Sequence, residues 1–217
     1  MKPHEGGPVL LGGASLDTAR GAAIMVHGRG ASPANILELV PAIDRPDIAY
    51  LAPGAAGGTW YPQSFMAQRE RNEPGISSGL SVIGALVDML EARGFTPRQI
   101  LLLGFSQGAC LSSEFAVRHP RRYAGVMVLS GGLIGPPGTS WDDVAGDFEG
   151  APVFLGCSDV DPHIPADRVL ESEAVFRRLG ADVTRVLYRG MGHLVNDDEI
   201  ARVQKSIDAI MPRVTRA

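Results

Sequence analysis

The sequence contains few cysteines, and no apolar run in it is long enough to cross a membrane. Cys110 and Cys157 are too few for a disulfide framework and lack the clustered spacing of a metal site, so we expect both to be small buried residues. The chain has no stretch of about 18 uninterrupted apolar residues. Its N-terminal stretch MKPHEGGPVLLGG lacks the apolar segment of a secretory signal. These absences predict a cytoplasmic protein without a membrane span.

Basic residues are not in excess either. The formal net charge is −4, and no basic cluster is interleaved with aromatic residues, so nucleic acid is not an expected partner. Hydrophobic residues make up 45% of the chain and charged residues 20%, which is ordinary for a globular protein. The 217 residues suffice for one α/β domain and are few for two. We therefore expect a single domain over residues 1–217.

Short apolar runs with the length and branching of β-strands alternate with helix-like segments. The expected strands cover residues 22–27, 47–52, 100–105, 124–130, 152–157 and 183–188. Most show no polar alternation, which is typical of strands buried on both faces. Helices are expected over residues 33–42, 76–94, 107–118, 167–179 and 197–210. This order predicts a mostly parallel, twisted sheet with helices on both faces.

A glycine- and proline-rich segment, residues 131–150, interrupts this alternation. Loops of such length in compact domains are uncommon and are usually functional. We expect the segment to form a lid or a binding rim.

Ser106 stands between two glycines, where an expected strand ends and an expected helix begins. In such a nucleophile elbow, a strained turn lifts the serine oxygen above the sheet edge. The tight turn leaves no room for a β-carbon two residues before or after, which accounts for Gly104 and Gly108. The helix aims unpaired N–H groups at the same place, so the Gln107 N–H is a candidate oxyanion donor. The alternative is a serine in an ordinary glycine turn.

A second oxyanion donor is expected from the stretch MVHGRGAS, residues 25–32. Its glycines, Gly28 and Gly30, allow the backbone to approach a ligand closely. In this type of fold the second N–H comes from a loop after an earlier strand, and Arg29 is the residue we select. His27, at the end of the expected strand, is an alternative candidate for the catalytic base, but we expect it to brace this loop by hydrogen bonds.

Two further loops follow expected strands and supply a base and an acid. His193 lies in a glycine-rich loop before the last helix and can act as general base toward Ser106, with an aspartate on its other ring nitrogen. His163 remains an alternative base because it lies in the loop that carries the aspartates. His4 is expected in a mobile terminal segment, and His119 at the surface end of a helix.

Five motifs together resemble the acyl-protein thioesterase/carboxylesterase family of α/β-hydrolases, in the family's order and over nearly the whole chain. They are HGRG at 27–30, GTWYP at 58–62, GFSQGA at 104–109, SDVDPHIP at 158–165 and GMGHLV at 190–195. The resemblance implies an α/β-hydrolase fold, with Ser106 as nucleophile and His193 as base. It also implies Asp161 as the acid, because the family's Asp-x-Asp-Pro-x-Val-Pro pattern aligns there without a gap. Asp159 is the fallback.

The substrate region departs from the family pattern at Arg29, where leucine or threonine is common. A guanidinium bordering the acyl pocket would favour a carboxylate or another anion. The alternative is that Arg29 faces solvent or pairs with an acidic neighbour. Trp60 and Tyr61 resemble the family's aromatic substrate rim, although an aromatic pair can equally be packing. Phe65 is a further candidate for the pocket.

These residues predict a serine hydrolase that cleaves small carboxylic esters or thioesters, perhydrolysis and acyl transfer being alternatives with the same catalytic groups. A catalytically silent α/β-hydrolase that acts as a small-molecule receptor is a third alternative. No metal or cofactor is required for the predicted chemistry. Related family members often form dimers, so the resemblance allows a homodimer.

Overall fold

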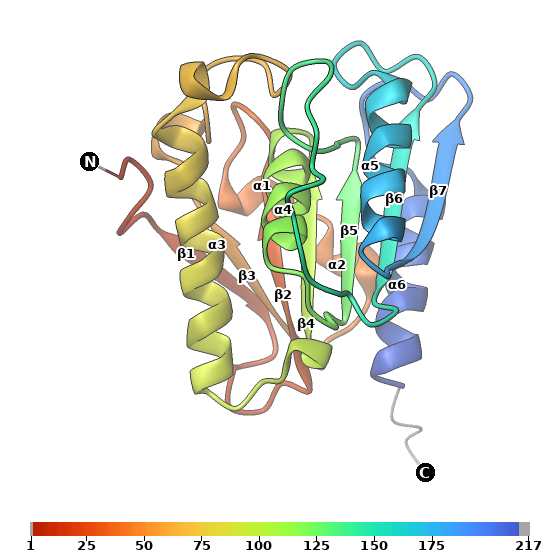
Figure 1. Cartoon of the computed structure of the whole chain (residues 1–217). Coiled ribbons are helices and arrows are strands. Elements are labelled where there is room, and N and C mark those ends of the chain that lie inside the picture. Colours follow the sequence, from red (N-terminus) through yellow and green to blue (C-terminus); the bar gives the residue numbers. More distant parts are fainter. Residues whose placement is uncertain (1, 213–217) are drawn as a thin grey trace.

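A seven-stranded sheet runs through the computed structural model, which describes residues 2–212 (Figure 1). Its strands are β1 (Val9–Gly13), β2 (Gly21–Val26), β3 (Ile48–Pro53), β4 (Ile100–Phe105), β5 (Gly125–Leu129), β6 (Pro152–Ser158) and β7 (Asp182–Tyr188). The spatial order is β1-β3-β2-β4-β5-β6-β7, and only β1 runs antiparallel to its neighbour. The expected mostly parallel sheet is confirmed.

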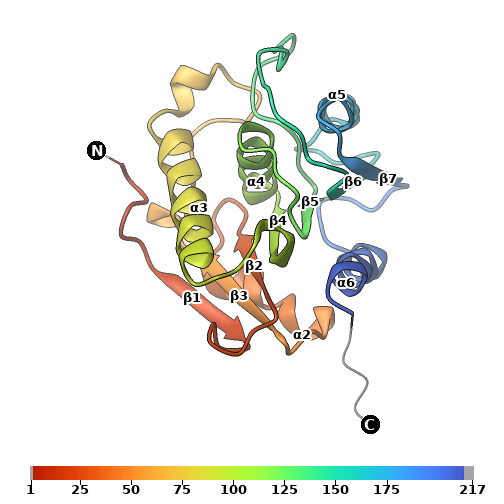
Figure 2. The ribbon, with the colours of Figure 1, turned by 60° about the horizontal axis from the view of Figure 1, so that its bottom comes forward.

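Helices cover both faces of this sheet (Figure 2). One face carries α3 (Gly75–Ala92), α4 (Gln107–Arg118) and α5 (Ala166–Arg178), and the other carries α1 (Pro33–Leu37), α2 (Val40–Ile43) and α6 (Asp197–Ile210). Short 3₁₀ turns lie at η1 (Ala56–Gly58), η2 (Arg69–Asn72) and η3 (Pro97–Gln99). Successive strand residues point to opposite faces, so Ile24 packs with the α3–α5 layer and Met25 with the α1–α2–α6 layer.

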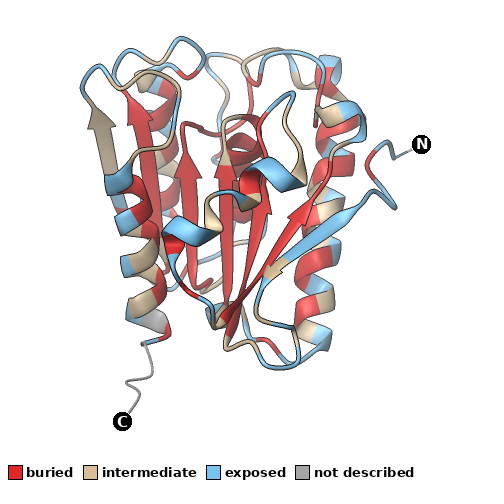
Figure 3. Cartoon of the chain, turned by 180° about the vertical axis from the view of Figure 1, so that it is seen from behind, coloured by how far each residue is buried: buried red, intermediate tan, exposed pale blue. Residues whose placement is uncertain are grey.

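The central strands are buried on both faces, whereas β1 is not (Figure 3). Leu11 in β1 exposes 64% of its surface. The sequence-based prediction does not include this strand because four of its five residues are exposed and it ends in two glycines, which are poor strand formers. It pairs with β3 at the edge of the sheet.

The expected helix over residues 33–42 is instead two short helices, α1 and α2. Ser32 caps α1 through its hydroxyl oxygen, which accepts the Asn35 N–H. Pro41 lies in the first turn of α2, where the missing N–H is tolerated, whereas inside one continuous helix it would remove a hydrogen bond. The proline therefore explains the break.

Residues 131–150 do not form a lid over Ser106. Leu133, Trp141 and Phe148 are buried and hold this segment against the core. The guanidinium of Arg168 on α5 donates hydrogen bonds to the Leu133 and Gly135 carbonyls. The segment does not line the cavity beside Ser106, so the expectation of a lid or rim at that cavity is wrong.

One helix in the described part of the chain, α3, has the length and apolar composition of a membrane span. It packs with Ile76, Ile83 and Leu90 into the core on the face shared with α4. The cytoplasmic location stays a prediction.

Candidate active site

Ser106 lies at the carboxyl end of β4, directly before α4. Its backbone has φ 55° and ψ −120°, a conformation that is strained for a residue with a side chain. A β-carbon on Gly104 would collide with the Gly108 carbonyl, and one on Gly108 would collide with the Val26 carbonyl. Gly104 is therefore required by the tight strand-to-helix turn, as the sequence indicated, and Gly108 by the close approach of α4 to the end of β2.

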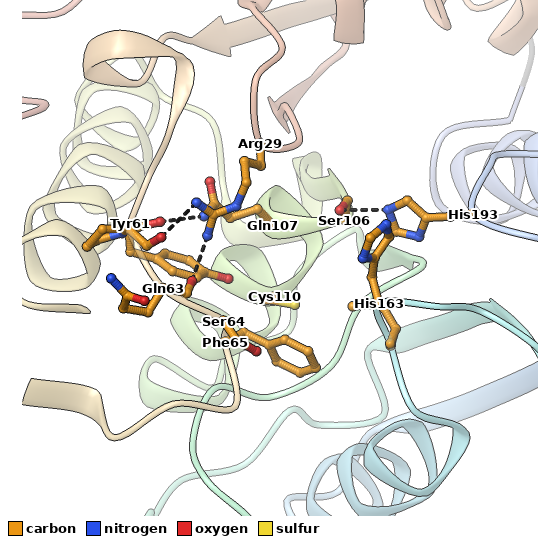
Figure 4. Close-up of a pocket in the computed structure, with 12 residues that line it drawn as sticks. Arg29, Tyr61, Gln63, Ser64, Phe65, Ser106, Gln107, Cys110, His163 and His193 are labelled. Atoms are coloured by element: carbon orange, nitrogen blue, oxygen red, sulfur yellow. Dashed lines mark hydrogen bonds between the residues drawn. The ribbon is translucent and has the colours of Figure 1, made fainter. Parts of the chain in front are cut away.

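A chain of hydrogen bonds joins three side chains that are far apart in sequence. His193 Nε2 lies 2.8 Å from Ser106 Oγ (Figure 4), and His193 Nδ1 lies 2.7 Å from Asp161 Oδ2. The three residues come from the β4–α4 turn, the loop after β7 and the loop after β6. Because these parallel strands end at the same edge of the sheet, their loops meet there.

The Asp161 carboxylate has hydrogen-bond partners on both oxygens. Its Oδ1 accepts the backbone N–H groups of His163 at 2.8 Å and Ile164 at 3.0 Å, while Oδ2 faces His193. The side chain is fully buried, and burial by itself would raise the pKa of Asp161. The hydrogen bonds from His193, His163 and Ile164 outweigh burial and lower this pKa. The acid is therefore ionised and fixed beside the imidazole.

Asp159 contacts the loop that carries His193 and is not hydrogen-bonded to the imidazole. Its Oδ1 accepts the Gly190 N–H at 2.8 Å. Ser158 adds a second anchor, because its Oγ accepts the Gly192 N–H at 3.1 Å. Sequence reasoning missed Ser158, although it is the last residue of β6 and begins the motif that was singled out.

His27 braces the loop after β2, as expected. Its Nδ1 lies 2.8 Å from the Gly28 carbonyl oxygen, and its Nε2 accepts the Ala55 N–H at 3.1 Å. Burial lowers the pKa of His27, which keeps the imidazole neutral and able to accept this hydrogen bond. The Gly30 N–H donates to the Gly58 carbonyl at 2.8 Å and ties the same loop to η1.

Gln107 contributes through its side chain as well as its position after Ser106. The side chain is buried, with Oε1 accepting the Trp60 N–H and Nε2 donating to the Tyr61 carbonyl, both at 2.8 Å. These bonds fix the segment after η1 beside the start of α4. The side-chain role could not be read from the sequence, which pointed only to the Gln107 N–H.

His4 is buried, contrary to the expectation of a mobile terminal segment. Its backbone N–H donates to Ser78 Oγ, its Nε2 lies 2.7 Å from the Trp60 carbonyl oxygen, and its Nδ1 accepts the Ala56 N–H. The reason is a set of contacts with residues 52 to 74 positions away in sequence. His4 thereby fixes the N-terminal segment against α3.

The other two histidines lie outside the hydrogen-bonded chain. The His163 ring stands edge-on to the His193 ring at a centroid distance of 4.8 Å. It is therefore a neighbour of His193 in the cavity wall. His119 lies at the end of α4 against Phe115, and burial is the main factor that lowers the pKa of His119.

A cavity of about 420 Å³ opens beside Ser106 (Figure 4). Tyr61, Phe65 and Cys110 supply apolar wall, whereas Gln63 and Ser64 make part of the wall polar. Its volume lies within the range of small-molecule sites. Two of the expected substrate-binding aromatics, Tyr61 and Phe65, thus border the cavity.

Trp60 is not part of this wall. Its indole is fully buried and donates from Nε1 to the His27 carbonyl at 3.0 Å. The ring packs against His4 and His27 at centroid distances of 5.1 and 5.2 Å. The structure therefore does not bring Trp60 to the cavity with Tyr61 and Phe65, and its side chain packs behind the loop.

The Arg29 guanidinium borders the cavity and is held by backbone carbonyls (Figure 4). Nη1 donates to the Pro62 carbonyl at 2.9 Å and Nη2 to the Gln63 carbonyl at 2.6 Å. The guanidinium carbon lies 5.9 Å from the centre of the Tyr61 ring. Among the described residues Arg29 has no ion pair, so its positive charge is not matched by a carboxylate there. The alternative of an acidic neighbour is therefore not met, whereas the alternative that Arg29 faces solvent is met in part, because the residue is exposed.

The cysteines have no thiolate character in this structure. Both are free and buried, and burial raises the pKa of Cys110 and of Cys157 to about 12 each. Cys110 lines the cavity and Cys157 lies 3.7 Å from Asp161 Oδ2. Within residues 2–212 no three His, Cys, Asp or Glu side chains are grouped as a metal site would require.

A mostly parallel sheet with helices on both faces and a serine in a strained turn after a central strand defines the α/β-hydrolase class. The chain belongs to the phospholipase/carboxylesterase family, whose model matches residues 14–211. Both the family and the fold predicted from the sequence motifs are confirmed, and the family is one of ester hydrolases.

Known proteins of this type show similarity over different parts of the chain. A crystal structure of a phospholipase/carboxylesterase from Dyadobacter fermentans is 38% identical, covers 95% of this chain and 98% of its own, and has a TM-score of 0.91. Acyl-protein thioesterase 1 of Eremothecium gossypii is 29% identical over 69% of this chain. The Kluyveromyces lactis protein of the same name is 33% identical over 58% of this chain. The matches span 66% and 56% of those two thioesterases.

Proposed function

We propose that the protein is a serine carboxylesterase or thioesterase that hydrolyses small esters or thioesters. The observation that carries this proposal is the hydrogen-bonded chain Ser106–His193–Asp161, with distances of 2.8 and 2.7 Å. Such a chain activates a serine oxygen that would otherwise be a weak nucleophile. The adjoining cavity offers room for a small acyl group, and family membership supports ester chemistry.

The reaction proceeds in two steps. In the first, His193 Nε2 takes the Ser106 proton as Oγ attacks the acyl carbonyl, and the proton then passes to the departing alcohol or thiol. In the second, water attacks the acyl-enzyme with His193 again as base, and Ser106 regains its proton. Asp161 fixes the imidazole tautomer and stabilises the charge on the ring. The Arg29 and Gln107 backbone N–H groups are our candidates for holding the oxyanion.

Arg29 favours substrates whose acyl group carries a negative charge. Its guanidinium stands at the cavity wall in a geometry fixed by the Pro62 and Gln63 carbonyls. No carboxylate of the described residues neutralises it, and a substrate anion can approach the remaining N–H groups. A long uncharged fatty chain fits such a wall less well.

A pair of near-isosteric esters tests this preference. The p-nitrophenyl monoester of succinate carries a carboxylate, and the corresponding levulinate ester replaces it with a methyl ketone. We expect Arg29→Leu to lower the ratio of kcat/KM for the charged over the neutral ester about tenfold, the scale of one hydrogen bond to a charged group. Arg93→Leu is the matched control, because Arg93 lies on the surface and pairs with Asp17.

The outcomes separate the two parts of the proposal. An unchanged ratio in Arg29→Leu would remove the anion preference and leave the esterase in place. Turnover of either ester that survives Ser106→Ala in a folded protein would remove the serine mechanism itself.

A further inference from the structure

A second cavity lies on the other side of His193. It has a volume of about 420 Å³ and is separate from the cavity that contains Arg29 and Tyr61. Its wall comes from the loop after β2, from α1 and the turn after it, from the end of β4, and from the loop after β7. The apolar lining residues are Ala31, Ile36, Leu39, Phe105, Leu194 and Val195.

The wall of this second cavity presents little polar chemistry to a ligand. Besides His193, its polar side chains are His27 and Asn35. Both ring nitrogens of His27 are engaged, by the Gly28 carbonyl and the Ala55 N–H, and Asn35 is engaged as well. Its Oδ1 accepts from the Ser32 hydroxyl at 2.8 Å and from the Ser32 N–H at 3.1 Å, and its amide nitrogen donates to Glu38 at 3.3 Å. The cavity therefore suits an apolar group.

The two cavities meet at His193, whereas Ser106 itself lines only the first of them. His193 lines both of them, and its Nε2 is the atom that faces Ser106 Oγ. Gly28 lines the second cavity directly beside the serine, since a β-carbon on Gly28 would stand 3.3 Å from the Ser106 Cβ. The Phe105 ring lies 5.0 Å from the His193 ring and continues the apolar wall up to the imidazole.

The chemistry of the proposed reaction separates the two halves of a substrate at this junction. When the bond between the acyl carbon and the leaving oxygen or sulfur breaks, the leaving atom takes its proton from His193 Nε2. The leaving atom must therefore lie next to the imidazole, and its substituent extends away from the acyl group. Gln107, a candidate oxyanion donor, lines only the first cavity.

We propose that the second cavity binds the apolar alcohol or thiol portion of the substrate, while the first cavity binds the acyl portion. This inference rests on the proposed esterase function and adds the class of leaving group. The substrate is then an ester whose acyl side is small and polar and whose alcohol side is an alkyl or aryl group. Leu194, which is 46% exposed, forms the outer wall of the alcohol site.

A series of alkyl esters with one fixed acyl group tests the assignment. Methyl, butyl and hexyl esters of the same acid have leaving alcohols of similar acidity, so differences in kcat/KM report binding of the alkyl chain in the transition state. We expect kcat/KM to rise about fourfold per methylene until the cavity is filled, from the transfer free energy of a buried methylene. The hexyl-to-methyl ratio should fall at least fivefold in Leu194→Ser.

A matched control and a second series keep the test decisive. Leu170 on α5 is exposed to a similar extent, 43%, and lies outside both cavities, so Leu170→Ser should keep the wild-type ratio. In a second series, methyl esters whose acyl chain is lengthened from acetyl to hexanoyl are compared. Here kcat/KM of Leu194→Ser should depend on acyl length as it does in wild type. Leu39→Ser provides a second variant of the cavity wall.

Three results would overturn the assignment. A wild-type hexyl-to-methyl ratio near one would mean that the alkyl chain finds no site. If Leu194→Ser changed the dependence of kcat/KM on acyl length and left its dependence on alcohol length intact, the second cavity would bind the acyl portion instead. If no ester gave turnover that depends on Ser106, both the proposed function and the assignment would fail. The first two results would overturn the assignment alone.

Discussion

His4 and His27 both pack on Trp60 and accept consecutive backbone N–H groups, those of Ala56 and Ala55 respectively. The accepting nitrogen of His27 carries no proton, and burial lowers the pKa of this histidine, so its imidazole is neutral in the folded protein. The Ala55–Gly58 segment that they hold also accepts the Gly30 N–H through the Gly58 carbonyl. These buried histidines thus connect the N-terminal segment to the loop that carries Arg29.

This arrangement predicts a loss of stability in mild acid. Burial lowers the pKa of His27 in the folded protein below the 6.5 of the unfolded chain, so below about pH 6.5 the unfolded chain binds more protons. The free energy of unfolding should therefore fall as the pH drops below that value. Urea unfolding at pH 7.5 and 5.5 should show a smaller fall for His27→Gln than for wild type. An equal fall in both proteins would contradict the neutral, buried imidazole.

Glu199 predicts a pH dependence of the opposite sign. It is fully buried in the first turn of α6, and burial raises its pKa to about 7 from 4.5. The folded protein then binds more protons than the unfolded chain between about pH 4.5 and 7, so this residue reduces stability as the pH rises through that window. Glu199→Gln should gain stability relative to wild type between pH 5 and 8, by on the order of 1.4 kcal/mol per pKa unit. A constant difference across this range would show that the carboxyl is not buried as described.

The two aspartates of the β6 loop should differ strongly in their effect on catalysis. Asp161→Asn removes the charge beside His193 Nδ1 and permits the wrong imidazole tautomer, so kcat should fall about 10³- to 10⁴-fold. Asp159→Asn keeps an oxygen that can accept the Gly190 N–H, and kcat should stay within about tenfold. Steady-state kinetics on one ester compares the two variants. Equal losses, or the larger loss in Asp159→Asn, would reverse the assignment of the acid.

Gly108 and Gly84 form a matched pair for the tight turn around Ser106. Gly108→Ala places a β-carbon against the Val26 and His27 carbonyls, and we expect a loss of about 3 kcal/mol or more in the free energy of unfolding. Gly84→Ala on α3 makes only an ordinary contact with Phe115 at 3.5 Å. That variant should be as stable as wild type or more stable by about 0.5–1 kcal/mol, because alanine favours helix. Denaturant unfolding measures both variants. If Gly108→Ala had the same free energy of unfolding as wild type and kept wild-type activity, the described packing would be refuted.

Local patterns were sufficient to predict the parallel core. Its strands are continuous apolar runs, and the elbow at Ser106 needs glycines at two fixed positions. Both features depend on short segments of chain, so they can be read without knowing what lies next to them. Conversely, β1 has exposed residues and glycines, and its strand conformation depends on pairing with β3.

The parts of the site that escaped prediction depend on contacts between distant segments. The burial of His4 depends on Ser78 and Trp60, and the position of the Arg29 guanidinium depends on the Pro62 and Gln63 carbonyls. No pattern within residues 1–10 or 25–32 encodes these partners. Backbone carbonyls are especially difficult to anticipate, because every residue has one.

The most direct test of the account compares kcat for p-nitrophenyl acetate in wild type and Ser106→Ala at neutral pH, with unfolding curves to show that both proteins are folded. The account predicts turnover by the wild type and a loss in kcat of about 10⁴-fold or more in the variant, the scale on which removal of a serine nucleophile acts. Comparable turnover by a folded Ser106→Ala protein, or none by the wild type with any ester, would contradict it.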